Sequence, residues 1–471
     1  MKKSLIQNLS VNVVQLIVNQ VAGLGIFYVL STSLDKNSFG QINLSLAILL
    51  AVFNILSLGI DQIAIKKIAS GVDINHVLSL YIIHVLLSGL GFYLVLFIGY
   101  YFFPQASMFY SLLLLIGIGK LMMFFSSPLK QAANGFERFR LLAYMSVVSN
   151  LVRCVGLIAL LLTRHLNIHT VIIIFILGDT AELLISIWLF KRKAATPFTI
   201  KWSIIGYREL LLESLPQTGV VLITSALARF DWIFIGFILS AIKLAEYSFA
   251  YKVFEISTLP LLAIAPLLIP KFTRFIQQKE MPVAELKILV RVEMMIAALT
   301  ILLINIYWAP VIDGITHGKY GLINSTTIFI LSLCMPFLYL NNFLWTLYFA
   351  QGRMKMILSS FVITFLVNVI GDLILIPFYK NEGAAFAFLI SCIVQSVFYF
   401  RKNTITDLKS IWYPIIPCTL SALVSGFACR VFLGKNWLII PASIIIYCLL
   451  LILFKQIRLS DRQRLAKLFN L

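Results

Sequence analysis

Long apolar stretches, separated by short polar ones, dominate the order of residues along this chain. A helix needs about 20 predominantly apolar residues to cross the hydrocarbon core of a bilayer. Fourteen stretches fit this length approximately, and they cover residues 9–30, 41–62, 76–103, 107–128, 141–163, 168–190, 214–239, 247–270, 289–309, 325–350, 355–377, 383–400, 411–432 and 437–455. The pattern predicts an all-α, polytopic membrane protein with about 14 transmembrane helices.

Composition excludes a water-soluble fold, because 61% of the residues are hydrophobic and only 12% are charged, against about 25% charged in soluble domains. The net charge of +19 would suit a nucleic-acid binder, but the basic residues are scattered over short loops between apolar stretches. With Met1 in the cytoplasm, 27 of the 38 Lys and Arg residues fall on the inner side, 7 on the outer side and 4 within spans. This asymmetry predicts that both termini are cytoplasmic.

Two pairs of similar segments suggest an internal repeat. AANGFERFR at 132–140 resembles FAQGRMKMI at 349–357, and ELLISIWLFKRK at 182–193 resembles AFLISCIVQSVFYFRK at 387–402. These matches predict two six-helix lobes in parallel orientation, related by a pseudo-two-fold axis along the membrane normal, with a central cavity between them. The predicted divisions are an N-lobe at 1–195, a C-lobe at 205–403, and two further helices with a basic tail at 410–471.

Four cations lie within predicted spans, where a charge costs roughly 2.5–3.5 kcal/mol on insertion scales. They are Lys120, Arg153, Arg229 and Lys252. We expect them to line a water-filled cavity and to bind an anion there. An unpaired Arg229 is the best candidate, since a guanidinium matches phosphate oxygens bidentately. For Lys252 the alternative is a local pair with Glu255, three residues on.

Five acids within the spans are candidates for coupling transport to a proton or cation: Asp179, Glu182, Asp231, Glu255 and Asp372. Asp179 and Glu182 share one helix face, so each raises the cost of ionising the other. The alternative is that both are counter-ions of Arg153. No nucleophile or metal-ligand spacing accompanies these acids, and we expect no catalytic residue, metal or cofactor.

A polar stripe runs along the first predicted helix at Asn8, Asn12, Gln15 and Asn19, with spacings of four, three and four. These side chains either line the cavity and bind the substrate or form hydrogen bonds between helices. Three prolines between 260 and 270 predict a broken eighth helix. The six cysteines all lie in apolar stretches, which is typical of small buried side chains and not of a disulfide framework.

Several segments resemble one family. LPQTGVVLITSALARFDWIFIGFILS and LAEYSFAYKVFEISTLPLLAIAPLLIPKF, which begin at 215 and 244, are similar to the seventh and eighth helices of bacterial polysaccharide exporters. These exporters are the O-unit flippases of the multidrug/oligosaccharidyl-lipid/polysaccharide (MATE-like) superfamily. Residues 38–70 resemble its first two helices and NEGAAFAFLIS at 381–391 its twelfth. One departure is the lack of an arginine that many relatives carry in the first helix. Anion binding in the first lobe therefore depends on Lys120 and Arg153.

The resemblance implies a flippase that moves a polyprenyl-diphosphate-linked oligosaccharide across the bacterial inner membrane, in O-antigen and lipopolysaccharide synthesis. Its implied partners are this lipid, the bilayer and the polysaccharide polymerase and ligase machinery, with no nucleic acid. One alternative is a multidrug or small-solute antiporter of the same fold. An enzyme such as a membrane glycosyltransferase or polymerase is disfavoured, because no outer loop is longer than roughly 15 residues.

Overall fold

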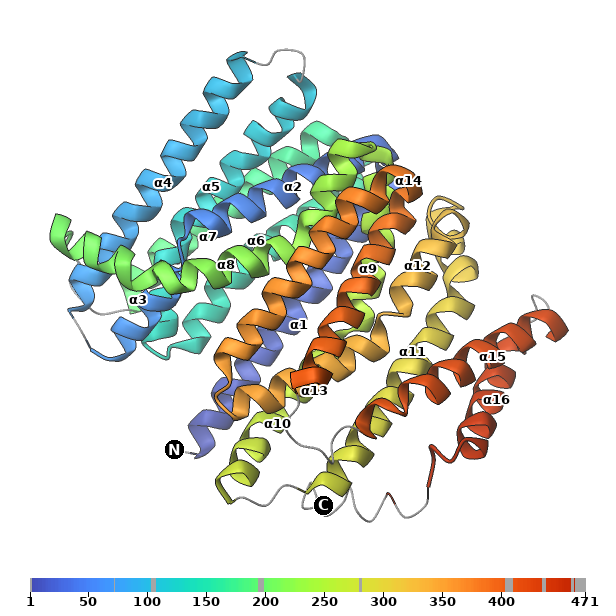
Figure 1. Cartoon of the computed structure of the whole chain (residues 1–471). Helices are drawn as coiled ribbons and strands as arrows, with labels where there is room; N and C mark the ends of the chain where they lie inside the picture. The colour runs from blue at the N-terminus through green and yellow to red at the C-terminus, as the bar shows by residue number, and fades with distance from the viewer. Residues whose placement is uncertain are drawn as a thin grey trace. The chain divides into compact units, whose positions relative to one another are not determined.

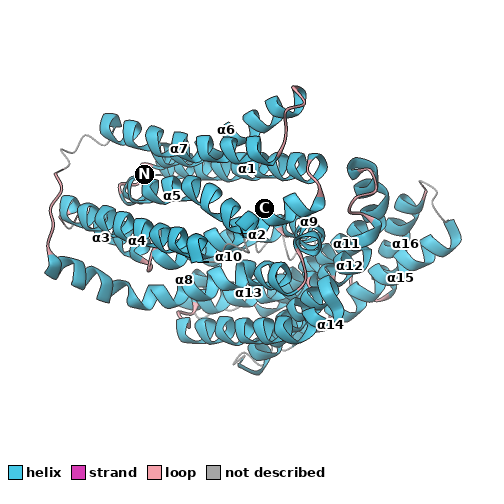
Figure 2. Ribbon diagram, turned by 90° about the horizontal axis from the view of Figure 1, so that it is seen from above, coloured by secondary structure: helices cyan, strands magenta, loops and turns pink. Residues whose placement is uncertain are grey.

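The computed structural model describes residues 2–71, 73–102, 107–193, 199–278, 282–402, 410–433, 438–458 and 461. All regular secondary structure in these ranges is helical (Figures 1 and 2). The chain divides into two compact units, residues 1–236 and 237–471. The segment after residue 204 thus groups with the first unit up to residue 236, although the sequence repeat assigns it to the C-lobe. The repeat itself remains a prediction.

The first unit contains seven complete helices and most of an eighth. These are α1 (Lys2–Ser33), α2 (Lys36–Leu56), α3 (Ile60–Ala69), α4 (Ile74–Phe102), α5 (Ser107–Gly135), α6 (Phe139–Leu162), α7 (Ile168–Lys193) and α8 (Ile204–Ile238). Helix α7 packs against both α5 and α6, α1 packs against α6, and α5 also contacts α2, α3 and α4. Helices α5, α6 and α7 therefore form the centre of this unit.

The predicted second span is divided into α2 and α3 at Gly59. This residue has a positive φ of 68°, a conformation that costs glycine little because it has no Cβ. A Cβ at this position would lie 2.7 Å from Cβ of Gln217 on α8. Thr218 on α8 also donates a hydrogen bond of 2.8 Å from Oγ1 to the carbonyl oxygen of Leu58. The break in the helix thus lets α8 approach the backbone closely.

The second unit contains the remaining helices. They are α9 (Ala241–Ser257), α10 (Leu259–Gln278), α11 (Val283–Thr316), the short 3-10 helix η2 (Leu322–Asn324), α12 (Ser325–Ser332), α13 (Met335–Ala350), α14 (Met354–Lys402), α15 (Ile415–Leu433) and α16 (Ile439–Leu453). Helix α11 is the hub of this unit, since it packs against α12, α13, α15 and α16. The predicted break in the eighth span lies at Thr258, between α9 and α10.

Helix α14 is two antiparallel helices joined by a sharp reversal. Lys380 leaves the helical region, with φ of 54° and ψ of −130°. A Cβ added to Gly383 would lie 2.4 Å from the carbonyl oxygen of Leu375, and one added to Gly371 would lie 2.9 Å from Cβ of Ala387. Pairs at equal distances before and after Tyr379 are thus in contact. Glycine allows this close approach, and the hairpin accounts for two predicted spans.

Ten helical segments of the described residues are long and apolar enough to cross a membrane, and α16 is a shorter apolar helix. One of the ten is the α14 hairpin, which contains two spans. Each of the fourteen apolar stretches found in the sequence coincides with a helix, one arm of that hairpin, or two consecutive helices. The prediction of an all-α, polytopic membrane protein is confirmed.

Candidate functional site

Three charged side chains meet in the interior of the first unit, one from each of its three central helices. The guanidinium of Arg153 on α6 contacts the Oδ2 atom of Asp179 on α7. Lys120 on α5 places its Nζ 3.8 Å from the same oxygen. Arg153 is 6% exposed and Asp179 is 1% exposed, so both side chains are almost completely buried inside the protein. Ser149 donates a hydrogen bond of 2.6 Å from Oγ to Oδ1 of Asp179.

A second buried pair lies beside the first. Lys130 on α5 is 2.5 Å from Oε1 of Glu182 on α7, and Ser126 donates a hydrogen bond of 3.3 Å to the same oxygen. One alternative from the sequence was that Arg153 is the counter-ion of both acids. The structure agrees for Asp179 but not for Glu182, because Lys130, which was assigned to a loop, lies within α5. Breaking one partner of such a buried pair typically costs 3–5 kcal/mol.

Together these groups form a cluster of three cations and two carboxylates: Lys120, Lys130, Arg153, Asp179 and Glu182. All five interact electrostatically. The cluster therefore carries one positive charge in excess. Lys120 is the most loosely held of the three cations, since its ion pair is the longest and its other contact is a hydrogen bond of 3.7 Å to Sδ of Met123. Its side chain is also 16% exposed.

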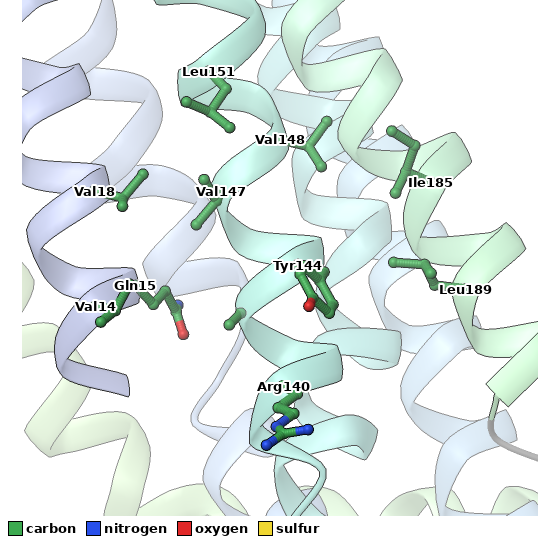
Figure 3. Close-up of a pocket in the computed structure, with 11 residues that line it drawn as sticks. Val14, Gln15, Val18, Arg140, Tyr144, Val147, Val148, Leu151, Ile185 and Leu189 are labelled. Atoms are coloured by element: carbon green, nitrogen blue, oxygen red, sulfur yellow. The ribbon is translucent and has the colours of Figure 1, made fainter. Parts of the chain in front are cut away.

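A groove of about 730 Å³ lies over α6, flanked by α1 and α7 (Figure 3). Its walls are mainly apolar, and its polar members are Gln15, Tyr144 and Arg140. In Figure 3 Arg140 lies at one end of the row of α6 side chains and Leu151 at the other. The lining residues are Val14, Gln15, Val18, Arg140, Ala143, Tyr144, Val147, Val148, Leu151, Ile185 and Leu189.

The two features occupy different faces of α6. The groove residues on α6 recur at spacings of three and one from Arg140 to Leu151, which places them on one side of a helix. The buried residues Leu141, Met145, Ser149, Arg153 and Leu157 recur every four residues on another side. One face of α6 therefore carries the ion cluster, and the other forms the floor of the groove.

The predicted polar stripe on α1 divides in the same way. Gln15 lines the groove. Asn19 accepts a hydrogen bond of 3.0 Å from Nδ2 of Asn150 on α6, which is the interhelical role that the sequence analysis left open. The side chains of Asn8 and Asn12 lie outside the part of the structure that is described.

Arg229 and Asp231 lie near the end of α8, within the first unit. The guanidinium of Arg229 stacks on the indole of Trp232, with Cζ 4.1 Å from the ring centroid. The expectation of an unpaired Arg229 is therefore wrong. Asp231 is 7% exposed and accepts a hydrogen bond of 2.8 Å from the backbone N–H of Trp232.

The other predicted residues lie in the second unit. Lys252 on α9 forms an ion pair of 2.8 Å with Glu255, so the predicted local pair is present. Asp372 in the α14 hairpin is fully buried and accepts a hydrogen bond of 3.4 Å from Nδ2 of Asn368. Whether any of the predicted residues contacts substrate or a coupling ion stays a prediction.

Besides Lys130, sequence reasoning missed Arg140 and Glu293. Arg140 was counted only as a loop cation, although its helical spacing from Tyr144, Val147 and Leu151 is visible in the sequence. Glu293 is a single acid in an apolar stretch of α11 and is 2% exposed. Like the five acids predicted to couple transport to a proton or cation, it is an acid within a predicted span.

Comparison with protein families gives one match. Residues 5–276, which are more than half of the chain, match the family described as polysaccharide biosynthesis protein. A search of curated proteins finds no matching sequence.

Several solved structures share the fold. A structure of the lipid II flippase MurJ in an inward closed conformation superposes with a TM-score of 0.74 and 15% sequence identity, covering 95% of this chain and 98% of the other. An inward-facing multidrug resistance MATE family transporter of the MOP superfamily gives a TM-score of 0.63 and 13% identity, covering 87% and 99%. A MOP superfamily transporter from Pyrococcus furiosus gives 0.53 and 14%, covering 87% and 93%. The chain thus has the fold of MOP superfamily transporters.

Proposed function

Because the chain belongs to the polysaccharide biosynthesis protein family, we propose that it is a flippase for a polyprenyl-diphosphate-linked oligosaccharide in the bacterial inner membrane. The family and the membrane-spanning helices support transport of a lipid-linked substrate. Proteins with the same fold include a lipid II flippase and multidrug transporters. O-antigen precursors are the substrate class that we favour, with polymerase and ligase enzymes acting on the product.

The groove over α6 is the observation that carries this proposal. Its apolar length suits a hydrocarbon chain, while Arg140 provides a cation at one end of its α6 floor (Figure 3). An arginine can bind diphosphate oxygens bidentately. The amide of Gln15 adds a donor and an acceptor for oxygen-rich groups. A lipid with an anionic head matches this distribution, because its hydrocarbon tail would contact the apolar walls and its anionic head would contact Arg140. A small hydrophilic solute would leave most of the groove unused.

The ion cluster supports the proposal through its excess positive charge. We infer that Lys120 contacts the diphosphate at a stage of transport when the head group has left the groove, because Lys120 is the least firmly paired cation of the cluster. Two unit charges 4 Å apart attract by about 4 kcal/mol at an effective dielectric constant of 20, before desolvation is subtracted. Arg153 holds Asp179 in place and keeps the excess charge positive.

Transport then requires access to the substrate from each side in turn. The division into two compact units is compatible with rocking of two lobes around a central cationic cavity. Arg229 and Lys252 are proposed as further anion contacts, with Asn12 and Asn19 as sugar contacts. The acids Asp179, Glu182, Asp231, Glu255 and Asp372 are proposed for coupling.

A matched pair of arginine variants tests the groove. Purified protein is reconstituted into proteoliposomes, and movement of a radiolabelled lipid-linked oligosaccharide between leaflets is measured. Arg140→Ala removes a charge-assisted hydrogen bond worth about 1.5–3 kcal/mol, so apparent affinity is expected to fall by about 10- to 150-fold. Arg138→Ala removes an exposed arginine at the start of the same helix but outside the groove, and it should retain wild-type affinity.

Two results would overturn the proposal. Equal affinity of the Arg140→Ala and wild-type proteins would exclude the groove as the binding site. Efflux of cationic drugs by the wild-type protein, without any movement of lipid-linked sugar, would identify a multidrug antiporter of the same fold instead.

A further inference from the structure

Helix α11 of the second unit contains a carboxyl group for which the transport scheme above has no role. Glu293 lies ten residues after the start of this helix, which is about 15 Å along its axis. The helix is long and apolar enough to cross a membrane. The side chain is 2% exposed, and its neighbours one helical turn away, Val290 and Ala297, are fully buried. Glu293 is therefore a buried acid within a transmembrane helix.

Glu293 differs from the other buried acids of the second unit in having no partner among the described residues. Its Oε2 atom is buried without a hydrogen bond. Glu246 pairs with Lys243 at 2.7 Å, and Asp372 accepts a hydrogen bond from Asn368. An acid that is buried to this degree without compensation is costly to keep ionised.

One titratable group of α13 interacts with Glu293. Tyr339 is fully buried, and it lies close enough to Glu293 for the two side chains to interact electrostatically. Its hydroxyl group also has no hydrogen-bond partner in the described part of the chain. Two unsatisfied polar groups, a carboxyl and a phenol, are thus enclosed in the same apolar region.

The cations of α11 face away from Glu293. Lys287 and Arg291 line a separate cavity of about 390 Å³, and at 100° per residue they are roughly 120° and 160° around the helix from Glu293. Arg291 is also occupied by an ion pair with Asp461. Neither cation is positioned to neutralise Glu293.

The remaining neighbouring elements supply no cation to Glu293 either. Helices η2 and α12 have no titratable side chain. Arg430 on α15 donates to the carbonyl oxygen of Asn305, twelve residues along α11, and Tyr447 on α16 donates to the carbonyl oxygen of Met295. The titratable and charged groups on the elements packed against α11 are Tyr339 and Tyr348 on α13, Cys418, Cys429 and Arg430 on α15, and Tyr447 and Cys448 on α16.

We propose that Glu293 is a proton-binding site in the transmembrane part of the second unit, and that it binds and releases its proton during transport. The coupling part of this inference rests on the transport function proposed above. In the state described here the carboxyl group is neutral and carries the proton. In another state of the cycle, contact with water or a cation favours the carboxylate, which returns the proton to the opposite side of the membrane. The proton comes from water on one side and goes to water on the other, so no further reactant is needed.

A proton fits this site better than a metal ion. A hard cation such as Ca²⁺ takes six to eight oxygen ligands, and among the described residues no group of three or more His, Cys, Asp and Glu side chains comes together. A proton needs only one carboxylate oxygen. The phenol of Tyr339 then provides a neighbouring oxygen that can accept from the neutral acid.

Infrared difference spectroscopy tests the binding site without any substrate. The full-length protein in lipid nanodiscs is expected to show the carbonyl stretching band of a protonated carboxylic acid at neutral pH. Glu293→Gln should remove that band, whereas Glu285→Gln, a less buried acid in the first turn of the same helix, should retain it. Tyr339→Phe should shift the band, because it removes the neighbouring hydroxyl group. This conservative variant keeps the test valid if Glu293→Gln folds poorly.

Three outcomes would overturn the inference. One is a wild-type spectrum without the Glu293 band at neutral pH. Another is loss of the band on addition of sodium chloride at constant pH, which would identify a metal cation as the ligand. The third concerns coupling: an imposed pH gradient should change the transport rate of wild-type proteoliposomes but not that of Glu293→Gln, and an equal response of both would exclude coupling. Absence of lipid-linked sugar transport by the wild-type protein would instead refute the proposed function and leave the infrared result unaffected.

Discussion

Replacement of Arg153 by methionine tests whether the ion cluster holds the first unit together. The substitution keeps most of the side-chain volume but leaves Asp179, which is 1% exposed, without its closest cation. Loss of one partner from a buried pair costs 3–5 kcal/mol. Lys120 remains 3.8 Å from Asp179 and compensates in part, so we expect a loss near the lower limit, about 3 kcal/mol. The stacking of Arg153 on Phe175, 4.5 Å from the ring centroid, is lost in the same variant.

The double variant Arg153→Met with Asp179→Asn provides the control. The asparagine is neutral and keeps an oxygen for the hydrogen bond from Ser149. Replacing both members of a buried pair is often neutral or even stabilising, so the double variant should recover most of the lost stability. Together with the stability of the Asp179→Asn single variant, this recovery gives the coupling energy between the two charges.

Unfolding of the purified protein in detergent can be followed with a thiol-reactive dye. Cys334, Cys392, Cys418 and Cys429 are buried in the folded protein and become reactive when it unfolds. A wild-type unfolding midpoint for Arg153→Met, or a double variant no more stable than the single one, would refute the assignment of Arg153 as the counter-ion of Asp179. If the double variant folds, its transport activity then shows whether the substrate also needs Arg153.

The remaining predictions concern a turn, a helix cap and an interhelical bond. Gly383→Ala places a Cβ 2.4 Å from the carbonyl oxygen of Leu375 and should destabilise the hairpin by about 1–3 kcal/mol; an unchanged unfolding midpoint would contradict this. Asp35 caps α2, and hydrogen bonds in the first turn lower its pKa below 3.8. Asp35→Ala should therefore cost about 1 kcal/mol at neutral pH, and the difference from wild type should vanish as the pH falls through that lowered pKa. A difference that persists in acid would be inconsistent with this cap. Asn150→Ala removes the bond to Asn19 and should cost about 1 kcal/mol. A melting temperature equal to that of the wild type in a thermal scan would show that this bond does not stabilise the fold.

The all-α, polytopic class and the places of the apolar helices could be predicted because hydrophobic length alone sets the requirement for crossing a bilayer. The partners of the charges could not. Asp179 and Glu182 are one helical turn apart on α7, yet Asp179 pairs with Arg153 and Glu182 with Lys130, because the choice depends on how the helices are rotated against each other. Periodicity can place a residue on a helix face, but it does not identify the helix that lies opposite.

The groove illustrates the same limit. The row of side chains from Arg140 to Leu151 is visible as a helical repeat, but a groove exists only because α1 and α7 rise on both sides of it. Glu293 was missed for a different reason. A single acid in an apolar stretch gives no information about a partner, and only the packed structure shows that none of the described residues supplies one.

The sharp reversal at Lys380 has a consequence for how the protein is made. The two arms of α14 are in contact almost from the turn itself. No hydrophilic linker separates them, so the first arm cannot be inserted and remain alone while the second arm is still being synthesised. The arms should enter the bilayer together, as one preformed pair. Lengthening the turn with a flexible insert would separate insertion of the first arm from insertion of the second. The second arm would then depend on its own hydrophobicity to be inserted.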